Sequence, residues 1–337
     1  MREFIKHLSD YFEIIPLYKR SSGWWDPSGL ISGYSLFDDS VYDFTTVKSS
    51  KNFRALVKSC NGVFVEGIRS DSVLALTVFS RMLGKPTILK DQGARYHGFS
   101  TLIRPELFCS ALVLQTPFEL RFYSSDKINK VILGNGVDTK VFSPATRSRR
   151  SHFLFVGRIT AHKGLEYLVR ALPSDSRLVM AGPISDLTYF KYLTTLRKWE
   201  QVSYVGQVTR TDLVSLYQHA LALVLPSVTI DHYGKHHDRP ELFGLVSLEA
   251  RSCGAPCVVS NVGGLPYTVE DGRDGFVIPE RNINKLQITL ERLQQDESLV
   301  MSMGREAHDI ILKGEALGTS YENYASRLLH LIEETIV

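Results

Sequence analysis

Short apolar runs of strand length recur along this chain and alternate with stretches of helical period, and this alternation constrains the fold more than any other feature. The runs occupy residues 63–68, 86–90, 111–116, 130–135, 153–158, 177–182, 220–227 and 255–261. Amphipathic stretches with apolar residues at helical spacing occupy 71–84, 165–173 and 211–220. Buried strands that alternate with helices are typical of parallel sheets. We therefore expect an α/β protein.

The length of the chain predicts two domains. A single α/β core is rarely as long as 337 residues, whereas two domains of roughly 150 to 190 residues each would fit. The segment 143–152 interrupts the pattern with proline, serines and arginines. We place the boundary there, with one domain at 1–148 and a second at 149–318.

The two parts of the chain differ in charge, although the net charge is only +3. Residues 1–150 carry 21 basic and 14 acidic residues, and the remainder carries 18 and 22, which gives +7 and −4. Peripheral contact of the first domain with an anionic membrane or a lipid-phosphate acceptor would explain this difference, and so would scattered, solvated lysines. The sequence has no dense stripe of basic residues with interleaved aromatics, so it does not predict nucleic-acid binding.

Neither a secretory signal nor an apolar run of about 20 residues is visible in the sequence. The four cysteines form no CxxC pair. We expect a cytoplasmic protein, with the inner membrane face as the place of any peripheral contact, and neither a disulfide framework nor a zinc site.

A first candidate site follows the run 153–158. It places Gly157 and Arg158 at a strand end and Lys163 at the start of a helix. A helix N-terminus with two nearby cations favours a phosphate or diphosphate. An ordinary strand-to-helix turn with exposed basic residues is the alternative.

A second candidate site is the segment PELFGLVSLEA, in which Glu241 and Glu249 flank the start of a helix. A helical separation of eight residues is about 12 Å, so the two carboxylates could contact opposite ends of a nucleotide-sugar. The amides of Phe243, Gly244 and Leu245 could meet its distal phosphate. Alternatively, both glutamates are ordinary residues at a helix start.

The second half of the chain resembles the retaining glycosyltransferases of family 4, which have the GT-B fold of two Rossmann-like domains facing a central cleft. The resemblance runs in order through GRITAHKG, MAGP, YVGQV, VLPS, ELFGLVSLEA, CGAPCVVSNVGGLP and DGRDGFVIP. Upstream, ILGNGVDTKVFSP resembles the end of the family's first domain, although Asn135-Gly136 is chiefly a turn signal. The resemblance also implies that the helix at 319–337 packs back on the first domain.

This resemblance implies a donor site in the second domain and an acceptor in the first. Arg158 and Lys163 would bind the donor diphosphate, Glu241 the transferred sugar and Glu249 the ribose, with Gly206 to Val208 near the base. The reaction would move a sugar from a nucleotide-diphosphate sugar to a saccharide or lipid-linked acceptor with retention, without metal or cofactor. There are two alternatives. The chain could be another GT-B enzyme, such as a sugar-nucleotide epimerase, or a non-catalytic module that binds a nucleotide-sugar or a glycan.

The chain departs from the family pattern at several places. The segment FIKHLSDYFEIIPLYK resembles the family's first helix and second strand, so we expect the family's first strand and glycine-rich loop to be absent, either in a natural short form or because the given start lies downstream of the full reading frame. Tyr267 stands where many members have glutamate. Asp91, or less favoured His97, could orient the acceptor hydroxyl, while a loop-stabilising aspartate and an exposed histidine are the alternative. The segment 229–240 carries His232, His236 and His237. We expect it to be a mobile loop over the sugar pocket rather than a metal site.

Overall fold

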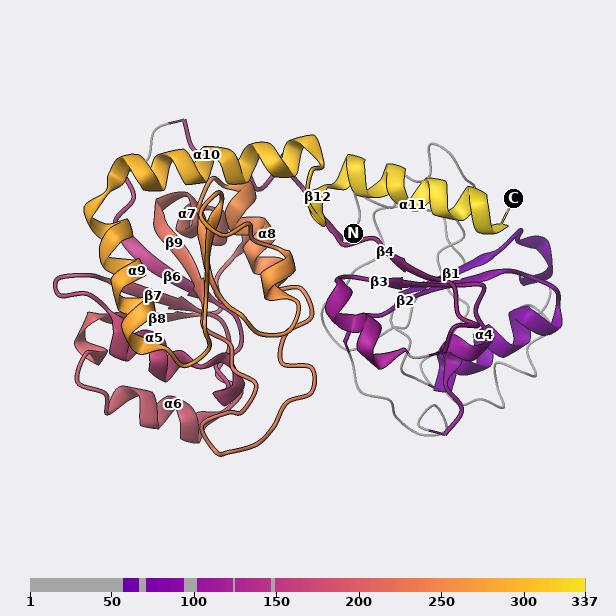
Figure 1. Cartoon of the computed structure of the whole chain (residues 1–337), viewed down its shortest axis with the longest axis horizontal. Coiled ribbons are helices and arrows are strands. Elements are labelled where there is room, and N and C mark those ends of the chain that lie inside the picture. The colour runs from indigo at the N-terminus through magenta and orange to yellow at the C-terminus, as the bar shows by residue number, and fades with distance from the viewer. Residues whose placement is uncertain (1–56, 67–70, 94–101, 124, 147–148, 337) are drawn as a thin grey trace. The chain divides into compact units, whose positions relative to one another are not determined.

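The computed structural model describes residues 57–66, 71–93, 102–123, 125–146 and 149–336 (Figure 1). The chain divides into two compact units. The first holds the described part of Met1–Gln115 together with Glu119–Leu133 and Glu322–Val337, and the second holds Thr116–Phe118 and Gly134–Tyr321. The sequence placed the boundary at residues 148 and 149, so the segment from Gly134 to that point lies in the second unit here.

The first unit is built on a four-stranded parallel sheet of order β1-β2-β3-β4. Its strands are β1 (Val63–Glu66), β2 (Thr87–Lys90), β3 (Ala111–Leu114) and β4 (Lys130–Ile132). Helix α4 (Asp71–Met82) connects β1 to β2, and 3-10 turns at Pro105–Phe108 and Pro117–Phe122 flank β3. Every residue of β2 and β3 is buried, which is why these strands read as continuous apolar runs.

The last helix, α11 (Tyr321–Ile336), belongs to the first unit except for its first residue. Tyr324 is buried, and its hydroxyl lies 2.7 Å from the Nζ atom of the buried Lys90 at the end of β2. The ammonium also lies 4.6 Å from the centre of the Tyr324 ring. The end of the chain therefore helps to form the core of the unit that holds β2.

The second unit is a six-stranded parallel sheet of order β11-β10-β9-β6-β7-β8. Its strands are β6 (His152–Val156), β7 (Leu178–Ala181), β8 (Val202–Gly206), β9 (Ala220–Leu225), β10 (Cys257–Ser260) and β11 (Gly275–Ile278). The connecting helices are α5 (Leu165–Ala171), α6 (Leu187–Thr194), α7 (Arg210–His219), α8 (Leu245–Ser252), α9 (Ile283–Gln295) and α10 (Glu297–Lys313). Helices α5 and α6 cover one face of the sheet, and α8 and α10 lie on the other side (Figure 1).

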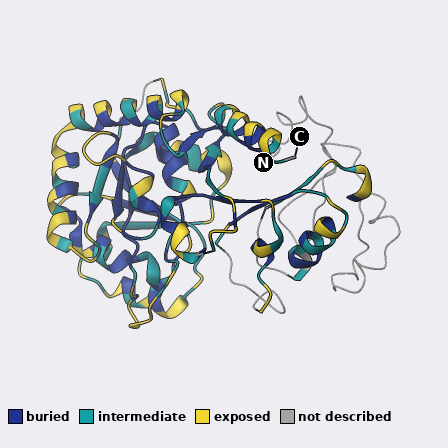
Figure 2. Ribbon diagram, turned by 45° about the vertical axis from the view of Figure 1, so that its right-hand side comes forward, coloured by how far each residue is buried: buried dark blue, intermediate teal, exposed yellow. Residues whose placement is uncertain are grey.

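Short polar side chains begin four of these helices. Asp186, Thr209, Asn282 and Asp296 each accept a hydrogen bond from a backbone amide in the first turn of the helix that follows. The core of the unit lies between the helices and the sheet, where β6, β7, β9 and β10 are buried almost throughout (Figure 2). The outer sides of the helices carry the exposed residues.

A separate two-stranded parallel pair, β5 (Asn135–Val137) with β12 (Gly318–Ser320), corrects one expectation. The run 130–135 was expected to be a single strand, and Asn135-Gly136 a turn. Instead β4 ends at Ile132, the chain turns at Gly134 with φ 75°, and Asn135 begins β5. A Cβ on Gly134 would lie 1.9 Å from the Leu317 carbonyl oxygen, so only glycine allows this approach.

Candidate functional site

The strand order of the second unit reverses between β6 and β9. From β6 the chain proceeds outward to β7 and β8, and it then returns to the other side of β6 to form β9 and β10. In open parallel sheets, ligands bind at the carboxyl ends of the strands where the order reverses. A ligand-binding site is therefore expected in the segments that follow β6 and β9.

The turn after β6 is shaped by close backbone packing. Gly157 has φ 152°, and a Cβ on Gly182, which follows β7, would lie 2.1 Å from the Gly157 carbonyl oxygen. Arg158 is exposed, and the next residues form the 3-10 turn Ala161–Lys163. Gly164 ends this turn in a left-handed conformation. It lies against Pro226 after β9, so the segments after the two strands touch here.

Lys163 and Glu241 form an ion pair at this point, although they are 78 positions apart in the chain. Their side chains are 15% and 17% exposed, so the pair is accessible but largely shielded from water. The loop after β10 fixes the backbone of Glu241, whose carbonyl oxygen accepts a hydrogen bond of 2.9 Å from the Gly264 amide. A Cβ on Gly264 would lie 1.7 Å from the Leu242 carbonyl oxygen. The motif that contains this glycine was noted in the sequence, but its role in placing Glu241 was not foreseen.

Helix α8 begins at Leu245, four residues after Glu241, so a helix starts near this glutamate as the sequence indicated. Phe243 is buried, Gly244 is left-handed with φ 75°, and Leu245 is 51% exposed as the first helical residue. Within the described part of the chain, no group accepts a hydrogen bond from the amides of these three residues. The start of α8 thus offers backbone donors and the positive end of a helix dipole to an anion.

Glu249 lies one turn into α8 and is half-buried. Burial raises the pKa of this carboxyl group, while a hydrogen bond of 2.8 Å from the Tyr217 hydroxyl and the charge of Arg210 oppose the rise. Tyr217 is fully buried, and its own pKa is raised by burial and by the Glu249 charge. Tyr217 was not predicted as a site residue, because a tyrosine on an amphipathic helix looks like an ordinary core residue.

Two predicted donor residues remain: Gly206 is the last residue of β8, and Val208 follows that strand at the same edge of the sheet. Gly206 has φ 70°, and its carbonyl oxygen accepts a hydrogen bond of 2.7 Å from the Gly182 amide. Both residues are half-buried. Tyr267 is 45% exposed at the end of the 3-10 turn Leu265–Tyr267 after β10.

Asp91, the predicted acceptor-side residue, lies in the first unit and is fully buried. One carboxylate oxygen accepts a hydrogen bond of 2.5 Å from the Tyr123 hydroxyl, and the other accepts one of 2.8 Å from the Gly93 amide. This geometry is that of the loop-stabilising alternative, and a role of Asp91 toward the acceptor stays a prediction. His97 lies outside the described residues.

Residues 229–240 form a hairpin rather than an open loop, and we call this segment the histidine hairpin. Ile230 and His236 form an antiparallel bridge, and the carbonyl oxygen of Thr229 accepts a hydrogen bond from the His237 amide. The three histidines have different neighbours: His232 stacks on Tyr192, His236 pairs with Asp238, and His237 bonds to Asp231. Within the described ranges, no three potential ligands are grouped to hold a metal ion.

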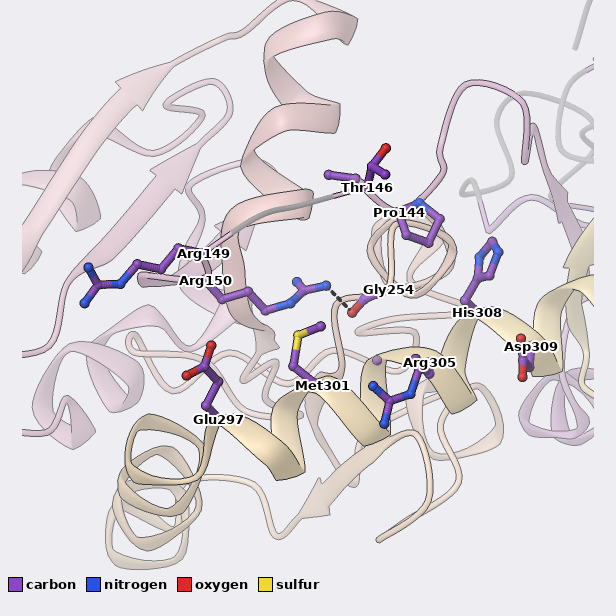
Figure 3. A pocket seen from close by; sticks show the side chains of 12 residues that line it. Pro144, Thr146, Arg149, Arg150, Gly254, Glu297, Met301, Arg305, His308 and Asp309 are labelled. Atoms are coloured by element: carbon purple, nitrogen blue, oxygen red, sulfur yellow. Dashed lines mark hydrogen bonds between the residues drawn. The ribbon is translucent and has the colours of Figure 1, made fainter.

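A cavity of about 560 Å³ lies at the opposite, amino-terminal edge of the sheet (Figure 3). Its lining includes Arg149, Arg150, Arg305, Glu297 and Asp309. The guanidinium of Arg150 already donates to the carbonyl oxygens of Ala220 and Gly254, and the two acids offset much of the remaining positive charge. None of the predicted donor residues lines this cavity.

Comparison with known proteins supports the interpretation of the second unit. The family described as glycosyl transferases group 1 matches residues 137–309, which is more than half of the chain. The chain is 31% identical over 221 residues to D-inositol 3-phosphate glycosyltransferase of Paenarthrobacter aurescens, covering 58% of this chain and 52% of that protein. It is 35% identical over 149 residues to an uncharacterized glycosyltransferase of Methanocaldococcus jannaschii, covering 42% and 35%. The chain thus spans about half the length of the curated relatives it matches, or less.

Solved structures show the same fold. A glycosyltransferase from Rickettsia africae matches with a TM-score of 0.71 at 16% identity, covering 90% of this chain and 84% of that one. Anabaena HepE in complex with UDP matches with a TM-score of 0.68 at 15% identity, covering 86% and 84%. These similarities confirm the predicted GT-B fold with two Rossmann-like domains and parallel sheets. No helix in the described part of the chain has both the length and the apolar sequence needed to cross a bilayer.

Proposed function

Because the chain belongs to the glycosyl transferases group 1 family, we propose that it transfers a sugar from a nucleotide-diphosphate sugar to a saccharide or lipid-linked acceptor, with retention at the anomeric carbon. The ion pair of Lys163 and Glu241 carries this proposal. It brings together a lysine, which would bind phosphate, and a carboxylate, which would bind sugar hydroxyls, where the strand order reverses; parallel sheets bind nucleotides at such a place. HepE, which shares this fold, was crystallised with UDP.

The diphosphate of the donor would lie between Lys163, Arg158 and the start of α8. As the bond between the anomeric carbon and the phosphate oxygen breaks, negative charge grows on the leaving nucleoside diphosphate. Fixed cations and unpaired amides stabilise such charge because they are already oriented before the reaction. These groups belong to the chain itself, so the proposed mechanism needs no metal.

The two carboxylates would orient the other parts of the donor. Glu241 would accept hydrogen bonds from hydroxyl groups of the transferred sugar, and Glu249 would accept them from the ribose. A bound diphosphate would share Lys163 with Glu241, which leaves lone pairs of the carboxylate available to the sugar. Gly206 to Val208 would lie near the base.

The first test is the release of nucleoside diphosphate from a panel of nucleotide-sugars, with and without saccharide and lipid-linked acceptors. We expect Lys163→Ala and Glu241→Ala each to lower transfer by at least about 100-fold, because each removes a group that acts on the departing charge or on the sugar. Lys191→Ala, which changes an exposed lysine on α6, is the matched control and should transfer at the wild-type rate. Circular dichroism would verify that all three variants are folded.

Two outcomes would contradict the proposal in different ways. Wild-type rates in either active-site variant would refute the assignment of residues. A wild-type chain that binds a nucleotide-sugar but never releases the nucleoside diphosphate with any acceptor would instead be a binding module.

A further inference from the structure

The two ends of the histidine hairpin lie beside Lys163 and Glu241, the two partners of the ion pair. At its start, the amide of Val228 donates a hydrogen bond of 2.9 Å to the carbonyl oxygen of His162, the residue before Lys163. At its end, Pro240 leads directly into Glu241. The position of the hairpin and the geometry of the ion pair are therefore coupled through the backbone on both sides.

His162 is the contact between the hairpin and the turn that presents Lys163. Its ring is half-buried, with Nδ1 at 3.2 Å from the hydroxyl of Thr160 and its ring centre at 4.9 Å from that of His237. Thr160 and His162 belong to the short segment between Arg158 and Lys163. A side chain that packs on His162 thus restricts the segment that carries both cations.

His237 is itself held in place from within the hairpin. Its Nε2 lies 2.7 Å from a carboxylate oxygen of Asp231, and its side chain is only 17% exposed. The other carboxylate oxygen of Asp231 accepts hydrogen bonds from the amides of Tyr233 and Lys235, at 2.9 and 3.0 Å. The carboxylate therefore ties the His237 ring to the fold of the hairpin tip.

Resting on the proposed function, we propose that His237 is a positioning residue for the donor site, which holds the His162 ring and thereby keeps Lys163 in place for the donor diphosphate. A reactive group that must be placed within about 0.5 Å depends on the residues that pack behind it. His237 does not touch the diphosphate in this scheme. Its effect passes through the ring of His162 to the neighbouring lysine.

Other contacts keep the hairpin docked when His237 is replaced. The amide of Thr229 donates to Glu280 at 2.6 Å, and the guanidinium of Arg281 donates to the Ile230 carbonyl oxygen. On the other side, the His232 ring stacks on Tyr192 at 4.1 Å between ring centres. A substitution at His237 should therefore loosen the Lys163 turn without releasing the hairpin.

The test is calorimetric titration of the full chain with uridine, guanosine and adenosine diphosphates. We expect His237→Ala to weaken the diphosphate that binds wild type by about 10-fold, and the donor KM to rise in parallel, as for a loss of about 1.4 kcal/mol. His236→Ala is the matched control, because His236 is the neighbouring residue of the hairpin and its exposed side chain pairs only with Asp238 among the described residues. It should bind within about twofold of wild type.

Two further variants separate the contacts of His237. His237→Phe keeps a ring against His162 but loses the bond to Asp231, and His237→Gln keeps a donor for Asp231 but loses the ring. Partial recovery of affinity by either variant, relative to His237→Ala, supports the positioning role. This comparison also remains informative if His237→Ala proves unstable.

Equal affinity of His237→Ala and wild type would overturn the proposal, and so would equal losses in the His237 and His236 variants. Recovery by neither Phe nor Gln would overturn it as well. A wild-type chain that binds none of the diphosphates would overturn the proposed function together with this inference. The wild-type titration therefore separates the two failures.

Discussion

His162 shows how the surroundings of one residue set its charge. The pKa of His162 is lowered to about 3, mainly by burial. The nearby positive charges of Lys163, His237 and Arg158 add to this shift, and the charge of Asp231 opposes it. The folded chain therefore holds this imidazole neutral at neutral pH. An additional charge beside Lys163 and Arg158 would otherwise repel both cations.

This shift predicts how stability depends on pH. The unfolded chain binds a proton at His162 near pH 6.5, whereas the folded chain does so only near pH 3, so the contribution is complete above pH 6.5 and is lost as the pH falls. Between pH 6.5 and 5.0 we expect wild type to lose about 1.5 kcal/mol more unfolding free energy than His162→Gln. Urea denaturation at the two pH values measures this difference. Parallel losses in both proteins would show that His162 does not titrate in this way.

Helix α8 links several features of the site. In the proposed function its first residues would offer amides to the diphosphate, its fifth residue is Glu249, and Glu241 lies three positions before its left-handed entry at Gly244. A Cβ on Gly244 would lie 2.7 Å from the side chain of Leu265, which belongs to the turn after β10. Both the left-handed backbone conformation and the close packing against Leu265 therefore disfavour any residue with a Cβ at position 244.

A pair of glycine substitutions tests this point. Gly244 and Gly272 have similar left-handed φ values, 75° and 79°, but a Cβ at Gly272 would meet nothing within 4 Å. Both Gly→Ala variants should lose about 1 kcal/mol through backbone strain. Only Gly244→Ala should lose more than this and also weaken the binding of nucleoside diphosphate, because Leu265 must move and the amides shift with it. Chemical denaturation and calorimetric titration of both variants would measure the two effects, and unchanged binding in Gly244→Ala would argue against the amides as donors.

At the scale of the whole molecule, the chain contributes its last helix to the unit in which it began. After forming the second unit, it returns as α11, and the Tyr324 hydroxyl accepts a hydrogen bond from the Nζ atom of Lys90 in the first unit. The proposed donor residues all lie in the second unit. Stability of the first unit and affinity for the donor nucleotide should therefore respond to different substitutions.

Tyr324→Ala tests this separation. We expect it to lower the free energy of unfolding of the first unit by about 3 kcal/mol, because it removes a buried ring and the hydrogen bond with Lys90. Affinity for the nucleoside diphosphate should stay within about twofold of wild type. Scanning calorimetry with and without the nucleotide would assign the transitions, since the bound ligand raises that of the second unit. Ser326→Ala, which changes an exposed residue on α11, is the control. A large loss of nucleotide affinity in Tyr324→Ala would contradict the expectation that the stability of the first unit and donor affinity respond to different substitutions.

The amino-acid sequence was sufficient to predict the strands whose residues are nearly all buried. The apolar runs that became β2, β3, β6, β7, β9 and β10 were predicted because parallel strands covered on both faces need apolar side chains at every position. In the second unit, the partly buried edge strands β8 and β11 appeared only as motifs, whereas the partly buried edge strands β1 and β4 of the first unit were predicted from their apolar residues. The short pair β5 and β12 was not predicted, because strands of three residues carry no periodic signal.

The sequence also placed Lys163 after one strand and Glu241 near the start of a helix, but it could not show that they meet. Their contact depends on the order of strands in the sheet, which puts β9 beside β6 rather than beside β8. The same holds for His162 with His237, and for Asp91, whose partner Tyr123 is 32 residues away. Local periodicity depends on neighbours in the chain and can be read from it, whereas these contacts depend on packing between distant segments and only the tertiary structure decides them.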